Sequence, residues 1–197
     1  MTRALALLAL LLAAANATAG DLTLEIRDPQ GALVADALVY AEPVSGAAPA
    51  VRAGTRVTVD QVNKEFVPRV SIVQSGTEIF FPNSDNIRHS IYSFSPAKTF
   101  TTKLYSGREA APVLFDKTGL VVLGCNIHDK MVAWVLIVDS PWIGRSGADG
   151  IATLRALPAG EYRVTAAAPA TAFKPQIATI KLDAAPLRQA LSLQAGS

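Results

Sequence analysis

Residues 125–131 read Cys-Asn-Ile-His-Asp-Lys-Met and lie between two short apolar runs, 120–123 and 132–138. Both runs consist mainly of valine, leucine and isoleucine, and glycine, serine and proline mark their outer ends. Short apolar runs bounded in this way are typical of buried strands. We therefore expect a tight connection between two strands, which brings a thiol, an imidazole and a thioether to one point.

Few other side chains in the sequence can bind a soft metal ion. The sequence has one Cys, two His and two Met, and one Met is the initiator. The second histidine, His89, follows another strand-and-turn pattern at residues 79–85. Two imidazoles, one thiolate and one thioether are the ligand set of a mononuclear electron-transfer copper site, whereas zinc sites rarely use a thioether. These residue types indicate one copper ion per chain.

The N-terminus has the pattern of an export signal. Arg3 precedes a core of Ala and Leu at residues 4–15, and Ala-Thr-Ala follows at 17–19. This pattern predicts a secretory signal peptide, residues 1–19, and a periplasmic mature protein. A membrane anchor is the alternative, but a span needs about 20 apolar residues and this core is shorter, so we expect no membrane span.

Charge and cysteine content narrow the class of protein further. The 18 basic and 16 acidic residues are nearly balanced and form no long run of one sign. We therefore expect no nucleic-acid partner and no binding to an anionic membrane. One cysteine cannot form an internal disulfide, and an unpaired thiol in an oxidising compartment needs an explanation that metal ligation would supply.

Short, often alternating segments separated by turn residues run through the rest of the chain. None of them shows a sustained apolar period of about 3.6 residues, which an amphipathic helix would need. Many short strands with regular turn signals predict an all-β sandwich or barrel. The segments are 22–27, 33–40, 57–62, 66–73, 77–81, 91–94, 100–105, 112–115, 151–154, 162–166, 177–182 and 187–193.

The middle of the chain resembles a known family of β-sandwiches. Phe81-Pro82-Asn83 before His89, together with the spacing Cys-x-x-His-x-x-Met, resembles a cupredoxin of the plastocyanin and amicyanin type, and the short spacing is most similar to amicyanin. Residues 89–98 and 123–129 resemble exported bacterial proteins loosely labelled methylamine utilisation proteins. The resemblance implies a Greek-key cupredoxin domain at residues 56–141.

The flanks resemble a different β-sandwich. Residues 28–39 resemble the opening of a carboxypeptidase regulatory-like, transthyretin-like domain, and Asp149-Gly150 with residues 157–162 resembles a later hairpin of the same fold. Neither piece alone has enough strands to close a core. We therefore expect one discontinuous Ig-like or transthyretin-like sandwich, residues 21–55 plus 142–197, with the copper domain inserted in it. The alternative is that the N-terminal strands extend the cupredoxin sheet.

The cupredoxin resemblance implies a role for each candidate site residue. His89, Cys125 and His128 would be the three strong copper ligands, and Met131 the long axial one. Asn83 and the backbone N–H groups around the cysteine would orient the ligand loops. His128 would reach the surface at one ring edge and serve as the electron exit.

The same resemblance implies an exported type 1 (blue) copper protein that carries one electron as a monomer. Its redox partner, a cytochrome or a periplasmic oxidoreductase, would dock near His128. The alternatives are a module that stores, delivers or senses copper, and a structural or adhesive protein with a vestigial site. Four protein ligands leave no open coordination position, so we expect no enzyme.

Several residues near the motif have other interpretations. Asp129 beside His128 suggests a Cys-His-Asp hydrolase, but adjacent side chains on such a loop rarely converge. We interpret Asp85, Lys98 and Lys130 as solvated surface charges. Trp134 and Trp142 are interpreted as packing residues.

Overall fold

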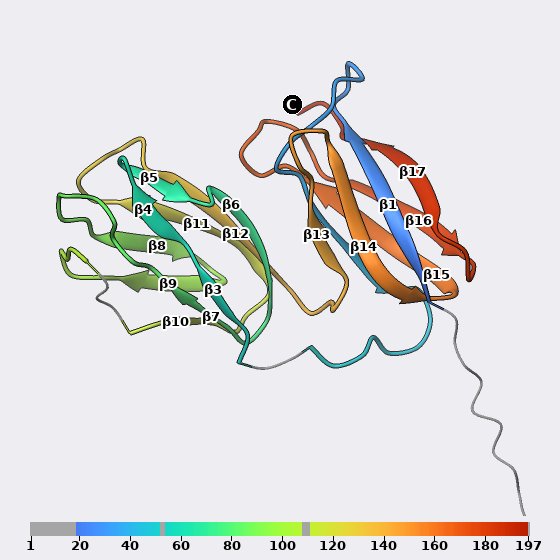
Figure 1. The fold of residues 1–197 in the computed structure, drawn as a ribbon, viewed down its shortest axis with the longest axis horizontal. Coiled ribbons are helices and arrows are strands. Elements are labelled where there is room, and N and C mark those ends of the chain that lie inside the picture. Colours follow the sequence, from blue (N-terminus) through green and yellow to red (C-terminus); the bar gives the residue numbers. More distant parts are fainter. Residues whose placement is uncertain (1–18, 52–53, 108–110, 197) are drawn as a thin grey trace, which may run out of the picture.

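The computed structural model describes residues 19–51, 54–107 and 111–196, and every regular element in that part of the chain is a strand. The predicted all-β class is thus confirmed. Figure 1 shows the strands in two groups, one coloured teal to yellow and the other blue, orange and red. The predicted signal peptide, apart from Ala19, lies outside the described residues. Within the described ranges, no helix has the length and apolar character that a membrane crossing requires.

The first group of strands comes from the middle of the chain. Its members are β3 (Arg56–Thr58), β4 (Asp60–Val62), β5 (Glu65–Val67), β6 (Val70–Gln74), β7 (Thr77–Phe80), β8 (Ile91–Ser95), β9 (Lys98–Thr101), β10 (Val113–Phe115), β11 (Gly119–Cys125) and β12 (Val132–Val138). One sheet has the order β6-β12-β11-β8-β9, a second has the order β10-β7-β3, and β4 pairs with β5.

Strands β11 and β12 position the loop between them. They pair antiparallel, with Leu123 opposite Ala133 and Gly124 opposite Val132. Alternate side chains of both strands are buried in one apolar cluster, because successive residues of a strand face opposite sides of the sheet. Residues 126–131 therefore form the short connection of a regular strand pair, and Cys125 is the last residue of β11, as expected for a loop between two strands.

The second group combines the two ends of the described chain. Its strands are β1 (Ala19–Arg27), β2 (Leu38–Pro43), β13 (Ile143–Arg145), β14 (Ile151–Pro158), β15 (Gly160–Ala167), β16 (Gln176–Leu182) and β17 (Leu187–Ser192). They form the sheets β14-β1-β17 and β13-β2-β15-β16. A separate cluster of buried side chains, drawn from residues 22–41 and 142–193, fills the space between them. The domain boundaries and the family of this sandwich stay a prediction.

Two turns in the second group do not form the hairpin that the sequence predicted. The turn at 147–150 is present, and Gly150 donates a backbone hydrogen bond to Gly147 O at 2.9 Å, but β13 and β14 lie in different sheets. Strands β14 and β15, joined through Ala159, also lie in different sheets. Turn chemistry specifies a local reversal of the chain, whereas burial of the apolar faces decides which strands pair.

The second predicted strand, residues 33–40, begins only at Leu38. Before it, Val34 donates a backbone hydrogen bond to Ile26 O, and Asp36 has a φ of +58°. A residue in the left-handed region interrupts a strand, because the extended conformation requires a negative φ.

Candidate metal centre

The ligand loop is fastened to the neighbouring strand at its first residues. Cys125 ends β11, pairs with Ile91 of β8 and is buried. Asn126 donates its backbone N–H to Ser90 O at 3.2 Å and its side-chain amide to Ser90 Oγ at 3.0 Å. These bonds hold the cysteine beside the residue that follows His89 in the sequence.

His89 is fixed by its backbone and is fully buried. It exchanges two backbone hydrogen bonds with Tyr105, each 3.0 Å long. Its Nδ1 atom lies 3.6 Å from the Cys125 Sγ atom, although the two residues are 36 positions apart in the sequence. The structure thus brings together two of the predicted site residues from separate segments.

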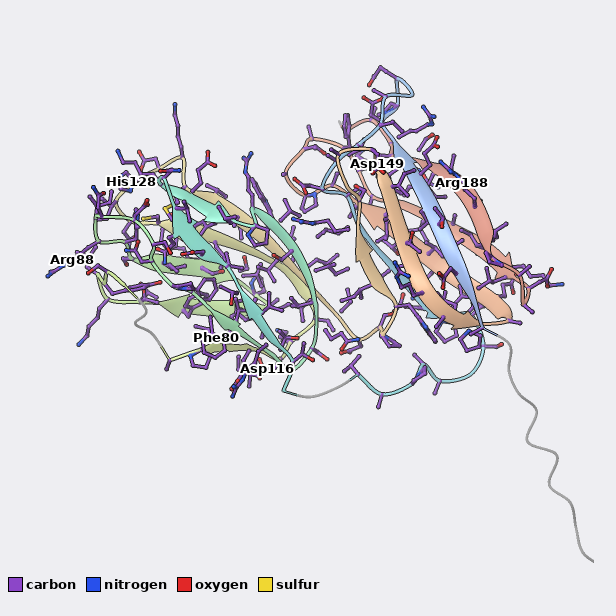
Figure 2. All side chains as sticks on the ribbon, in the orientation of Figure 1. Phe80, Arg88, Asp116, His128, Asp149 and Arg188 are labelled. Atoms are coloured by element: carbon purple, nitrogen blue, oxygen red, sulfur yellow. The ribbon has the colours of Figure 1, made fainter. Side chains whose placement is uncertain are left out.

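His128 completes a group of three donors. One ligand atom of each of His89, Cys125 and His128 lies within 4.8 Å of the others. The two imidazole rings meet edge to face with their centroids 5.1 Å apart. The Nδ1 atom of His128 is buried and has no hydrogen-bond partner, a state that normally costs free energy. Figure 2 shows His128 at the opposite end of this sandwich from Phe80 and Asp116.

Met131 lies at the end of the same loop. Its backbone N–H donates to His128 O at 2.9 Å and so closes the loop before β12 begins. Its side chain is only 1% exposed and belongs to the same buried cluster as Cys125. The thioether therefore points into the sandwich from the segment that supplies the thiol and one imidazole.

Asn83 orients the segment that carries His89. Its side-chain amide donates to Ile87 O at 2.9 Å and to Tyr105 O at 2.8 Å, and its Oδ1 accepts the Asp85 N–H at 3.0 Å. Burial raises the pKa of the Tyr105 phenol to about 12, although a hydrogen bond from Gln61 acts in the opposite direction. The phenol therefore stays neutral and can donate a hydrogen bond. The hydrogen bonds of Asn83 connect it to the segment that carries His89.

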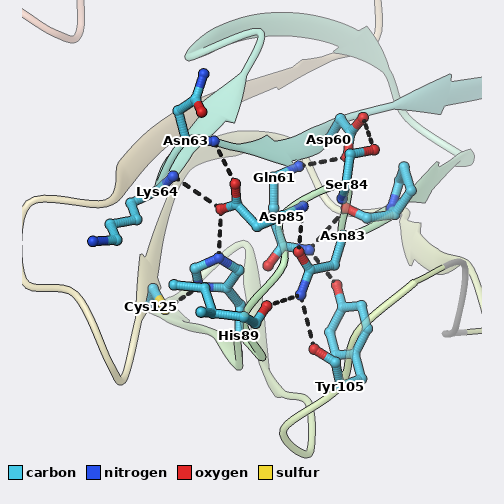
Figure 3. Close-up of polar contacts among 12 residues, drawn as sticks. Asp60, Gln61, Asn63, Lys64, Asn83, Ser84, Asp85, His89, Tyr105 and Cys125 are labelled. Atoms are coloured by element: carbon cyan, nitrogen blue, oxygen red, sulfur yellow. Dashed lines mark hydrogen bonds and ion pairs between the residues drawn. The ribbon is translucent and has the colours of Figure 1, made fainter.

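Asp85 is not the solvated charge that the sequence suggested. Its side chain is 10% exposed, and its Oδ2 atom lies 2.7 Å from His89 Nε2. The backbone N–H groups of Asn63 and Lys64 also donate to this carboxylate, at 2.5 and 2.9 Å (Figure 3). Burial alone would raise the pKa of Asp85, but the hydrogen bonds from Lys64, His89 and Asn63 outweigh it and lower the pKa below its usual value.

The donor set fits a copper ion. Imidazole nitrogen, thiolate sulfur and a thioether suit copper in both oxidation states. The unpartnered Nδ1 atom of His128 is the observation that favours a ligand here, because a buried nitrogen without a partner is otherwise unfavourable. Of the other two donors, His89 has its Nε2 atom bonded to Asp85, and its Nδ1 atom lies 3.6 Å from Cys125 Sγ.

No protein-family model matches the chain, and a comparison with curated proteins finds no match. Among solved structures, the chain is similar to a Cu-containing nitrite reductase from Thermus scotoductus SA-01, with 27% identity and a TM-score of 0.40 over 49% of this chain and 25% of the reductase. A reduced amicyanin variant shows 18% identity and a TM-score of 0.38 over 50% of this chain and 99% of its own. A purple cupredoxin from Nitrosopumilus maritimus shows 18% identity and a TM-score of 0.37 over 43% and 99%, respectively.

Proposed function

We propose that the protein is an exported mononuclear copper protein that carries one electron at a time between periplasmic partners. The convergence of His89, Cys125 and His128 within 4.8 Å supports this proposal. Three strong donors of these types, with a buried methionine on the same loop, match the ligand set of electron-transfer copper sites.

The bound ion would supply a centre that alternates between Cu(I) and Cu(II). His89, Cys125 and His128 would hold it, and Met131 would be the weak fourth donor. The surrounding residues keep these donors in place when the electron moves: Asn83 fixes the segment before His89, and Ser90 fixes the start of the ligand loop. Donors that stay in place lower the cost of reorganisation in each transfer.

His128 is the group that we assign to electron exit. It is the only one of the four candidate ligands that is not buried, and the adjacent Ile127 is 51% exposed. An apolar contact next to a partly exposed ligand suits the small and short-lived interfaces of redox partners. A cytochrome or a periplasmic oxidoreductase is the class of partner that such a surface would accept.

Copper delivery or sensing is the second candidate function. The separate core of the second sandwich favours it, because a simple carrier needs no further domain. The burial of the donors disfavours it. Cys125 is 4% exposed and Met131 is 1% exposed, so the ligands of a partner could not reach the ion until the loop opened.

Copper titration followed by absorption and EPR spectroscopy tests the proposal. We expect an intense visible thiolate-to-copper band in the wild type and reversible one-electron reduction. The band should vanish in Cys125→Ser and be strongly altered in His89→Ala. A wild type that stays colourless, or that holds zinc more tightly than copper, would contradict the proposal. Rapid loss of copper to an acceptor protein with slow electron exchange would favour delivery instead.

A further inference from the structure

The turn between β4 and β5 faces the carboxylate of Asp85. Its two central residues, Asn63 and Lys64, both have a positive φ, +53° and +64°, which is the pattern of a type I′ hairpin turn. In this conformation both backbone N–H groups point to the same side, where they donate to Asp85 Oδ1 and Oδ2. The hairpin thus holds a carboxylate that lies on a separate segment of the chain.

The same carboxylate determines which nitrogen of His89 carries the proton. An ionised carboxylate only accepts hydrogen bonds, so the Nε2 atom of His89, at 2.7 Å from Asp85 Oδ2, must be the protonated one. The Nδ1 atom is then unprotonated, and it faces Cys125 Sγ at 3.6 Å. A neutral imidazole binds a metal through its unprotonated nitrogen. The hydrogen bond therefore orients the ring and selects its donor atom.

We propose that Asp85, held by the β4–β5 turn, is a positioning residue that keeps His89 in its Nδ1-donor form and makes the site favour Cu(II) over Cu(I). The preference for Cu(II) depends on the proposed copper function, whereas the positioning of His89 concerns the protein without metal. Carboxylate–histidine pairs at other metal sites orient the ring and raise the basicity of the ligand.

Charge explains the preference for the oxidised ion. The Asp85 side chain is only 10% exposed, so water screens its negative charge poorly. A negative charge next to a ligand stabilises the more positive ion more strongly. Removal of the charge should therefore weaken the binding of Cu(II) more than that of Cu(I), and the reduction potential should rise.

Nitrogen NMR of the isotope-labelled, metal-free protein tests the positioning role. For the neutral imidazole, we expect wild-type His89 to carry its proton on Nε2. Asp85→Ala should give a mixture of both tautomers. Asp60→Asn is the control, because Asp60 bonds to Gln61 and Ser84 in the same region and should leave His89 unchanged. A wild-type His89 protonated on Nδ1, or one that averages both forms, would overturn the inference even if the variants do not fold.

Copper binding tests the effect on the ion. In Asp85→Asn we expect Cu(II) affinity to fall about 10- to 100-fold, the usual cost of losing such a partner. The Cu(II)/Cu(I) affinity ratio should fall about tenfold, which raises the potential by about 59 mV. Equal shifts in Asp85→Asn and Asp60→Asn would overturn this role of Asp85. A wild type that binds no copper would refute the proposed function, and the NMR result would still decide whether Asp85 positions His89.

Discussion

The ring of Tyr92 lies against the backbone of Gly124, so closely that a Cβ atom added at position 124 would come within 2.6 Å of the ring carbon Cζ. The two residues are directly paired between β8 and β11, and Cys125 follows Gly124 in the chain. The tyrosine thus occupies the space that a side chain at position 124 would need, next to the candidate thiolate ligand.

Replacement of Gly124 by alanine should displace the Tyr92 ring and lower the free energy of unfolding by about 1–3 kcal/mol, as overpacking usually does. Denaturant unfolding measures the change. The double variant Gly124→Ala/Tyr92→Ala should be less destabilised than the sum of the two single variants, because the clash is absent. If the loss of free energy of unfolding in the double variant equals the sum of the losses in the two single variants, the predicted clash does not exist.

Replacement of Met131 by leucine should separate ligation from packing. The side chain is buried and the volume is conserved, so the metal-free protein should lose less than about 1.5 kcal/mol of stability. If the thioether is the weak axial ligand, its loss should raise the reduction potential while the visible band persists. Voltammetry and absorption spectra of the copper form measure both. An unchanged potential would remove Met131 from the ligand set.

The left-handed conformation of Lys64 should matter for copper affinity. A β-branched residue is strained at a φ of +64°, so Lys64→Val should distort the turn and weaken the N–H donation to Asp85. Lys64→Gly adopts the same conformation without strain and also removes the charge, which makes it the matched control. We expect weaker copper binding in the valine variant alone. Equal affinities in the two variants would argue against a role for the turn.

The stability of the second sandwich should fall at alkaline pH. Burial raises the pKa of Tyr162, whose phenol donates to Pro158 O at 2.8 Å. The folded state therefore binds this proton more tightly than the unfolded state. Its stabilising contribution is complete below about pH 10, the ordinary tyrosine pKa, and is lost as the pH rises through the raised value. Denaturant unfolding at several pH values should show a shallower alkaline decline in Tyr162→Phe than in the wild type.

The strands and the ligand loop could be predicted because they depend on local patterns. Residues 120–123 and 132–138 are two short apolar runs separated by the segment that contains the ligand loop, which is sufficient to predict a strand pair with a short connection. The proximity of His89 to that loop was implied by the count of donor residues and by the family resemblance, and by no local pattern, since the two segments are 36 residues apart.

Two other features were not predicted from the sequence. The prediction that Asp85 is a solvated surface charge was wrong because two of its partners are backbone N–H groups. Every residue except proline carries such a group, so the sequence does not reveal these partners. Its spacing of four residues from His89 was the one signal that could have suggested a pair. The sheet partners of β14 and β15 depend on the packing of the whole second sandwich, and the turns between strands do not reveal them.

The first and last strands, β1 and β17, are parallel neighbours in one sheet. Figure 2 shows Arg188, on β17, on the side of the molecule remote from His128. Beyond β17, Gln194 pairs with Lys174, which lies between β15 and β16, so a linker attached at the C-terminus would be anchored to the second sandwich and not to the strands that carry the ligand loop.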